Sequence, residues 1–279
     1  MENINFILPE IFISLSIMFL LIFGVFKKNS SDLVYLFSVL VLLIALGLII
    51  NFPNYQNIFL FNNSYKIDQL TVFMKLITII SGIFVLISSY NYSKIEKISN
   101  IEYPILILCS ILGMLVMIGS YDLIVFYIGI ELQSLSLYVL AAYKINNIKS
   151  SEAGLKYFVL SALSSGILLY GCSLIYGLSG STNFQLISEN IFSLENKNVF
   201  GLVFILVGLA FKISAVPFHM WAPDVYEGSP TSITLFFALV PKVAALTVFI
   251  RLLYVPFFNL IDQWQMIIIF LSLASMIFG

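Results

Sequence analysis

Long apolar stretches separated by short polar connections dominate this chain. A helix that crosses a bilayer needs about 20 consecutive apolar residues, because it rises 1.5 Å per residue through about 30 Å of hydrocarbon. By this criterion the sequence predicts about nine spans. They cover residues 6–26, 33–52, 67–90, 103–119, 121–143, 152–178, 198–220, 230–254 and 263–279. We therefore expect an all-α polytopic membrane protein, in which the fourth and fifth spans form a tight antiparallel pair.

The span over 198–220 contains a lysine and, a little later, a proline. A charge such as that of Lys212 costs about 2.5–3.5 kcal/mol at the centre of a membrane helix. Pro217 has no N–H to donate to the carbonyl of Ile213, and its ring crowds that carbonyl. Interrupted backbone within a bilayer is tolerated only where it is buried in protein or lines a water-filled cavity. The sequence thus predicts a helix broken near Pro217, beside an ion or proton path.

The composition agrees with a membrane protein and narrows its chemistry. Hydrophobic residues make up 61% of the chain and charged residues 10%, whereas soluble domains carry about 25% charged residues. A net charge of −1 gives no electrostatic case for binding nucleic acid. Cys109 and Cys172 lie in apolar runs, which is typical of buried thiols, and His219 is the single histidine. We therefore expect no disulfide, no metal and no cofactor in this chain.

The basic residues predict an orientation in the membrane. Lysines follow the first, third and fifth spans, namely Lys27, Lys28, Lys94, Lys97, Lys144 and Lys149. The opposite side has only Lys66, Lys197 and, at a helix end, Arg251. Because basic residues favour cytoplasmic loops, we expect the N-terminus outside and the lysine-rich connections inside. No cleavable signal is predicted, since the N-terminus lacks a basic segment.

Ionisable residues lie within four consecutive predicted spans, as Glu131, Lys156, Lys212 and Lys242. Each would cost several kcal/mol alone in lipid, so they should face inward, pair, or meet water. The alternative is that buried pairs only fix the packing of helices. Lys156 is also near enough to a helix end to reach the interface. His219 is either a packing or capping residue or a proton relay.

Two further patterns concern helix packing. Asp68 and Lys75 lie near one end of the third span, where they are either interfacial or buried. Small residues predict close approach between helices. These are Ser161–Gly166 and Gly171 in the sixth span and Gly208 in the seventh.

Three segments carry a resemblance to a known family. They are Glu131–Ala141 (ELQSLSLYVLA), Glu152–Phe158 (EAGLKYF) and Phe211–Thr231 (FKISAVPFHMWAPDVYEGSPT). They resemble the antiporter-like membrane subunits of respiratory NADH:quinone oxidoreductase, complex I, and the resemblance extends over essentially the whole chain. The other antiporter-like subunits usually have a His-Ala-Glu-Ala type sequence after this core. Val225–Gly228 stands there instead and is similar to subunit 2.

The resemblance implies two inverted five-helix repeats, each with a broken helix. It divides the chain into N-terminal helices (1–102), a first repeat (103–254) and the start of a second repeat (255–279). The remainder of the second repeat, with its own broken helix and lysine, is absent. We therefore expect either a separate chain that supplies the missing helices or a truncated sequence.

The resemblance also implies roles for the charged residues. Glu131 would pair with Lys212, and release of this pair would let Lys212 accept or yield a proton. Lys156 would modulate the pair, and Lys242 would carry the proton laterally. His219 would connect the path to the inside solvent. NADH, FMN, iron–sulfur clusters and quinone would be bound by partner subunits, the other membrane subunits of complex I among them.

Three functions remain open at this point. The first is a proton-translocating subunit of complex I, and the second a stand-alone cation/proton antiporter. The third is a structural scaffold whose ion pairs fix packing. The heavy use of Asn, Ile, Lys and Phe favours a mitochondrial inner membrane, with a bacterial plasma membrane second and a thylakoid third.

Overall fold

The computed structural model describes residues 2–27, 30–51, 57–96, 98–190 and 195–278, and only the backbone of residues 2–4 and 195–198. Three of the lysines used to predict the orientation in the membrane lie outside the described part, namely Lys28, Lys97 and the side chain of Lys197. Gly279 also lies outside it. The described elements are, in order, η1 (Glu2–Ile7), α1 (Leu8–Phe26), α2 (Ser31–Ile50), β1 (Ile58–Leu60), β2 (Tyr65–Ile67), α3 (Gln69–Ile95), α4 (Glu102–Gly119), α5 (Leu123–Ala141), α6 (Ile148–Ser179), α7 (Phe184–Asn190), α8 (Glu195–Ile213), α9 (Trp221–Gly228), α10 (Thr231–Tyr254), η3 (Phe258–Leu260) and α11 (Ile261–Phe278).

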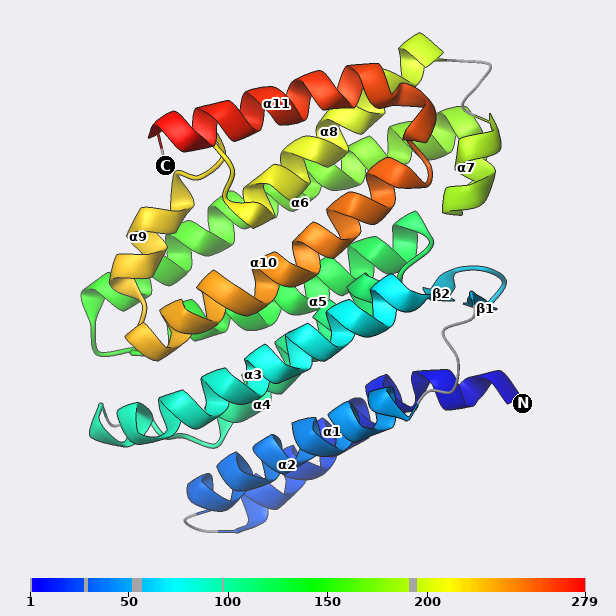
Figure 1. Cartoon of the computed structure of the whole chain (residues 1–279). Helices are drawn as coiled ribbons and strands as arrows, with labels where there is room; N and C mark the ends of the chain where they lie inside the picture. Colours follow the sequence, from blue (N-terminus) through cyan, green and yellow to red (C-terminus); the bar gives the residue numbers. More distant parts are fainter. Residues whose placement is uncertain (1, 28–29, 52–56, 97, 191–194, 279) are drawn as a thin grey trace.

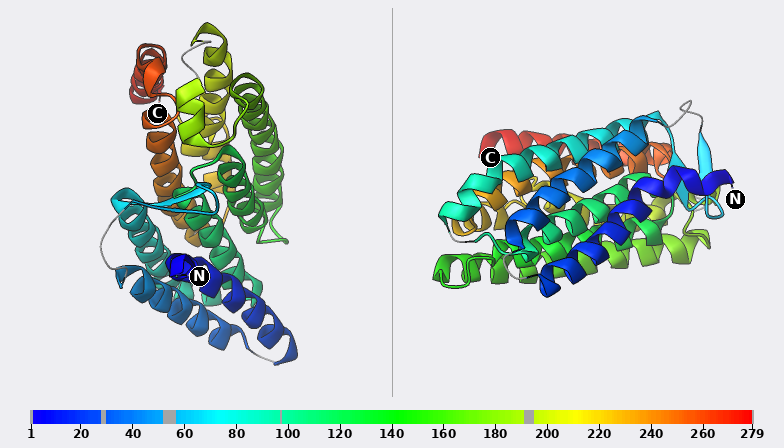
Figure 2. Two further views of the ribbon diagram at one scale, coloured as in Figure 1. Left: turned by 90° about the vertical axis from the view of Figure 1, so that its right-hand side faces the viewer. Right: turned by 90° about the horizontal axis from the view of Figure 1, so that it is seen from below.

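The long helices lie side by side in one bundle (Figure 1). The pair α1 and α2 forms one side, α3, α4, α5 and α10 form the middle, and α6, α8 and α11 form the other side (Figures 1 and 2). The β1–β2 hairpin, the beginning of α1 and α7 gather at one end of the bundle, which we call the hairpin end. The short helix α9 lies near the opposite end (Figure 1).

In the described part, 8 helices are long and apolar enough to cross a membrane. They are α1, α2, α3, α4, α5, α6, α10 and the segment Phe258–Phe278 that contains α11. The predicted class, an all-α polytopic membrane protein, is confirmed, but the count of nine is not. The difference is the predicted span 198–220, whose apolar part is the shorter helical stretch Val199–Ile213.

That span is interrupted, as the sequence predicted. Helix α8 ends at Ile213, and Ser214 follows with a positive φ of 60°. Residues 214–220 form turns before α9 begins. The carbonyl of Phe211 accepts bonds from the Ser214 N–H (3.1 Å) and from the indole Nε1–H of Trp221 (2.9 Å). Trp221 thereby donates a hydrogen bond to one of the carbonyl groups in the last turn of α8, which have no partner within a regular helix.

The predicted pairing of the fourth and fifth spans is also confirmed. Helices α4 and α5 are joined by residues 120–122, and the Asp122 carboxylate caps α5 by accepting a bond from the Ile124 N–H at 2.8 Å. A Cβ at Gly113 would lie 2.6 Å from the backbone nitrogen of Gln133. Only a glycine allows the two backbones to approach so closely.

The hairpin was not predicted from the sequence. β1 and β2 pair antiparallel with Ile58 opposite Ile67 and Leu60 opposite Tyr65. The turn passes through Phe61–Asn63, all with positive φ. The backbone N–H of Tyr121 donates to the carbonyl of Ser64 at 2.9 Å. The hairpin is therefore attached to the α4–α5 connection.

Candidate functional site

Lys212, near the end of α8, is the centre of a polar site between helices. Its side chain is 8% exposed. The Nζ donates to Ser134 Oγ on α5 and to Ser161 Oγ on α6, both at 2.7 Å. Three helices thus meet at one ammonium group, immediately before the break in α8.

The hydroxyls around Lys212 are themselves held in place. Tyr138 donates to Ser161 Oγ at 2.7 Å, and Ser134 donates to the Ile130 carbonyl at 2.7 Å. Sequence reasoning treated Ser161 only as a small packing residue. Its spacing from Lys212 in the sequence gave no sign of this contact.

The predicted ion pair between Glu131 and Lys212 is not formed in the described structure. The Lys212 Nζ lies more than 4.0 Å from both carboxylate oxygens of Glu131, which is too far for an ion pair. Lys212 donates to the two serines instead. Glu131 is nevertheless close enough for a favourable Coulomb interaction with Lys212. Its Oε1 is buried and has no hydrogen-bond partner in the described part. A carboxylate with an unused acceptor thus lies near a lysine held by neutral groups.

Lys242 and His219 lie on either side of α9 in the sequence. The Nζ of Lys242 lies over the ring of Tyr226, which belongs to α9, at 5.6 Å from its centroid. His219 belongs to the turns that follow α8, and its Nδ1 is buried without a described partner. The carbonyl of His219 accepts the Ala222 N–H at 2.9 Å. Both residues are therefore connected to the short helix after the break.

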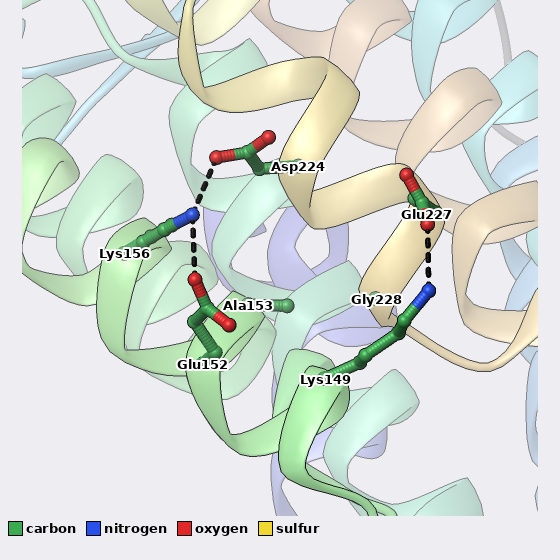
Figure 3. Close-up of a pocket in the computed structure, with 7 residues that line it drawn as sticks. All are labelled: Lys149, Glu152, Ala153, Lys156, Asp224, Glu227 and Gly228. Carbon is green, nitrogen blue, oxygen red and sulfur yellow. Dashed lines mark hydrogen bonds and ion pairs between the residues drawn. The ribbon is translucent and has the colours of Figure 1, made fainter.

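Lys156 lies at the surface and not in the polar site around Lys212. Its Nζ lies 2.7 Å from Asp224 Oδ2 and 2.8 Å from Glu152 Oε1, with 43% of the side chain exposed. A second pair joins Lys149 to Glu227 at 2.9 Å. Figure 3 shows these side chains bridging α6 and α9 around a pocket. This exposed position agrees with the alternative that Lys156 reaches the interface, and its modulation of Glu131 and Lys212 stays a prediction.

Close packing accompanies these surface pairs, which we call the α9 clamp (Lys149–Glu227 and Lys156–Asp224). A Cβ at Gly228 would lie 2.6 Å from both the Ala153 Cβ and the Lys149 carbonyl oxygen. The hydrogen bond from Lys149 lowers the pKa of Glu227 below its ordinary value. The clamp thus fixes α9, the helix that carries Tyr226, against α6.

Comparison with known proteins decides the family. Residues 120–279 match the family described as "NADH:quinone oxidoreductase/Mrp antiporter, TM". The chain belongs to this family. The match includes Glu131, Lys212 and the broken helix, so the site described above lies within the family's shared region.

Relatives and solved structures of this family agree with the assignment. The chain is 70% identical to NADH-quinone oxidoreductase subunit N of Pelagibacter ubique (strain HTCC1062), over 100% of this chain and 59% of that protein. It is 50% identical to subunit N of Bartonella bacilliformis, over 98% of this chain and 58% of that one. The chain therefore spans about three fifths of the length of these curated relatives. Respiratory complex I from Thermus thermophilus has a chain 27% identical, with a TM-score of 0.76 over 87% of this chain and 52% of its own.

A more distant structure shows the fold alone. The Mrp complex from Dietzia sp. DQ12-45-1b has a chain 20% identical to this one, with a TM-score of 0.76. The match covers 91% of this chain and 49% of that chain. The helical arrangement of this chain is thus found in that complex as well.

Further buried charges lie on α1, α3 and α10, away from the Lys212 site. Lys75 is fully buried and forms an ion pair with Glu10 of α1. Asp68 accepts a bond from the Arg251 Nη2 at 2.8 Å. Sequence reasoning left Asp68 and Lys75 open and did not single out Glu10. Among the described residues, no group of 3 or more His, Cys, Asp or Glu side chains could hold a metal ion.

Proposed function

We propose that this chain is a proton-translocating membrane subunit of an NADH:quinone oxidoreductase, of the kind named subunit N in its bacterial relatives. The observation that carries the proposal is the buried Lys212, which meets Ser134 and Ser161 beside an unpartnered Glu131 oxygen, at the break in α8. Membership of the redox-linked and antiporter family supports it.

The mechanism we favour has two arrangements of Lys212. In one, its ammonium donates to the two serine hydroxyls. In the other, it reaches the free Oε1 of Glu131 and forms an ion pair. A carboxylate near a buried ammonium favours the charged form, and loss of that contact favours release of a proton. Switching between the two arrangements would thus load and unload Lys212.

The remaining site residues have proposed roles based on their neighbours. Lys242 would take the proton onward, because this half-buried lysine of α10 lies over Tyr226 of α9. His219, in the turns after α8, would connect Lys212 to solvent at the α9 end. Lys156 would act through the α9 clamp and not in the proton path. We retain the proposed division into N-terminal helices 1–102, a first repeat 103–254 and the start of a second repeat 255–279.

Cofactors, partners and location remain proposals. Electron transfer by NADH, FMN, iron–sulfur clusters and quinone would take place in other subunits, membrane subunits of the same complex among them. The relatives named above are bacterial, which favours a bacterial plasma membrane and gives no support to a mitochondrial one. They also carry the designation subunit N and not subunit 2. The comparisons give no support to a separate chain that supplies further helices, and we do not propose one.

Substitution of Lys212 offers the decisive test. In the assembled oxidoreductase, Lys212→Met should lower coupled proton translocation by about 10²-fold or more, the contribution of one positioned proton-transfer group. Glu131→Gln should act in the same direction. The measurement is the pH change in sealed vesicles on addition of NADH, together with the amount of chain in the complex.

Lys94→Met is the matched control, because Lys94 is an exposed lysine paired with Asp32. Wild-type translocation in Lys212→Met would contradict the proposal. Loss of the chain from the complex in both site variants would favour the scaffold function. Cation flux through the chain without electron-transfer subunits would favour the stand-alone antiporter.

A further inference from the structure

A buried ion pair lies at the hairpin end of the bundle, on helices that the family match does not include. Glu10, on α1, is 5% exposed, and Lys75, on α3, is 0% exposed. Lys75 Nζ donates to Glu10 Oε1, and Tyr65 of β2 donates to the same oxygen at 2.8 Å. The two charged residues are 65 positions apart in the sequence. The pair therefore exists only because α1 and α3 pack together.

The pair is incompletely hydrogen-bonded. Glu10 Oε2 is buried and has no partner among the described residues. The only described hydrogen bond of the Lys75 ammonium, which has three N–H groups, is the one to Glu10. The ammonium also lies over the Tyr65 ring, 5.0 Å from its centroid. A buried pair that only stabilises packing needs good hydrogen bonds to its remaining atoms to offset desolvation.

A neighbouring ion pair shows what a saturated arrangement looks like in this protein. Arg251 of α10 is 5% exposed. Its Nη2 donates to Asp68 and Thr71, both at 2.8 Å, and its Nη1 to the Ile118 carbonyl at 2.9 Å. Asp68 in turn accepts from the Thr71 N–H at 2.8 Å as the cap of α3. Two pairs at the same end of the bundle thus differ in how fully their polar atoms are used.

Tyr65 is fixed beside the pair by the surrounding backbone. A Cβ at Gly119 would lie 2.0 Å from the Tyr65 ring, so the glycine makes room for it. An isolated bridge joins Tyr65 to Ser120. Burial, and next the neighbouring Glu10 charge, raise the pKa of Tyr65 well above its ordinary value. Tyr65 therefore remains a hydrogen-bond donor to Glu10 and orients its carboxyl group.

The acidic residues of the described helices that pack against α1 lie far from Glu10. Glu10 lies in the first turn of α1, whereas the acidic residues of α2 and α4, Asp32 and Glu102, lie in their first turns at the far end of the bundle. The charge of Arg251 also acts on Tyr65. Lys75 lies about 9 Å along α3 from its first residue, by 1.5 Å per residue. The pair is thus close to the hairpin end, where loops reach solvent.

We propose that Glu10 and Lys75 form a second proton-exchange site, which connects the bundle to water at the hairpin end, with Tyr65 as the positioning residue. In the first step a proton passes from Lys75 Nζ to Glu10, so that an N–H bond breaks, an O–H bond forms and both groups become neutral. In the second step the Glu10 carboxyl gives this proton to water. Lys75 is recharged by a proton that arrives from the interior. The site's use in translocation rests on the proposed function, but its titration does not.

The first experiment is an infrared titration of the full chain in lipid. If Glu10 exchanges a proton with Lys75, its carboxyl group should contribute a protonated-carboxyl band whose intensity changes with pH. The band should be missing in Glu10→Gln and unchanged in Asp32→Asn, which removes an exposed pair between α2 and α3. A spectrum of Glu10→Gln identical to the wild type at every pH would overturn the proposal, whether or not the chain translocates protons.

The second experiment measures proton translocation in the assembled oxidoreductase. Lys75→Arg keeps a positive charge that cannot be released, so it should lower translocation by about 10²-fold or more. The double variant Glu10→Gln with Lys75→Gln removes both charges. It should be present in the complex in the wild-type amount but should translocate fewer protons. A purely structural pair predicts the opposite, with Lys75→Arg or the double variant translocating like the wild type, and that result would overturn the proposal. Lys212→Met separates the two claims, because it tests the proposed function independently of Glu10 and Lys75.

Discussion

At the scale of single residues, the main feature is a buried ammonium held by neutral hydroxyls. Ser134 and Ser161 satisfy two protons of Lys212 but do not neutralise its charge. A charge in such a place depends on compensation at longer range, here from Glu131. This arrangement leaves Lys212 free to exchange one set of acceptors for another, which a tight ion pair would oppose.

Ser161 offers a test of that argument. Ser161→Ala removes one acceptor of Lys212 and the acceptor of Tyr138. A hydrogen bond to a charged group contributes about 1.5–3 kcal/mol, so we expect proton translocation to fall by about tenfold to a hundredfold. Ser161→Thr keeps the hydroxyl and is the control. Equal rates of NADH-driven translocation for the two variants would show that the hydroxyl is not needed.

The sequence predicted some of these residues and could not predict others. Glu131, Lys212 and Lys242 were identified because a charge within a long apolar run is costly wherever the helix packs. The pairing of Glu10 with Lys75 was missed, because which helices become neighbours is not encoded in the local periodicity of either one. The same limit applies to Ser161, whose partner belongs to α8.

At the scale of elements, glycines determine how closely helices approach. A Cβ at Gly171 of α6 would lie 2.9 Å from the Gly201 carbonyl oxygen and the Ile205 nitrogen of α8, whereas a Cβ at Gly166 would meet nothing within 4 Å. The sequence marked both as packing positions, and for Gly166 this was wrong. Five residues place the two glycines about 140° apart around α6, so only one can face α8.

This difference predicts opposite effects of the same substitution. Gly171→Ala should destabilise the chain by about 1–3 kcal/mol, because backbone atoms of α8 must move to admit a methyl group. Gly166→Ala should be neutral or stabilise by up to about 1 kcal/mol, since alanine has the higher helix propensity and space is open. Thermal unfolding of the purified chain measures both. A lower midpoint for Gly166→Ala than for Gly171→Ala would contradict the observed packing.

The break in α8 was predicted well, although its form was not. Pro217 indicated where helical hydrogen bonding must fail, and the helix does end shortly before it, at Ile213. The conformation beyond Ile213 could not be predicted from the proline. There the Trp221 indole satisfies the Phe211 carbonyl, and the chain resumes as α9. The apolar run 198–220 therefore contains one shortened helix and the beginning of another, which explains the difference in the count of spans.

At the scale of the whole molecule, the two ends of the bundle differ in how they hold charge. At the hairpin end, ion pairs are buried between α1, α3 and α10. At the opposite end, the α9 clamp is exposed, with both partners of its Lys149–Glu227 pair largely in solvent. An exposed pair responds to pH and salt. The helix that this pair holds, α9, also carries Tyr226, which lies against Lys242.

Acidification should therefore loosen α9. The pKa of Glu227 is lowered from its ordinary value of 4.5 by the hydrogen bond from Lys149. A group with a lowered folded-state pKa stabilises the fold fully above its unfolded value and loses that contribution as the pH falls through the folded value. The measurement is the protection of residues 221–228 against hydrogen exchange, corrected for the intrinsic pH dependence of exchange. This protection should be constant above pH 4.5. Below that pH it should decrease by about twofold, as expected for an exposed pair. Glu227→Gln should lack this step at low pH, because an amide does not titrate there. An equal step in the variant would show that another group, and not the Lys149–Glu227 pair, fixes α9.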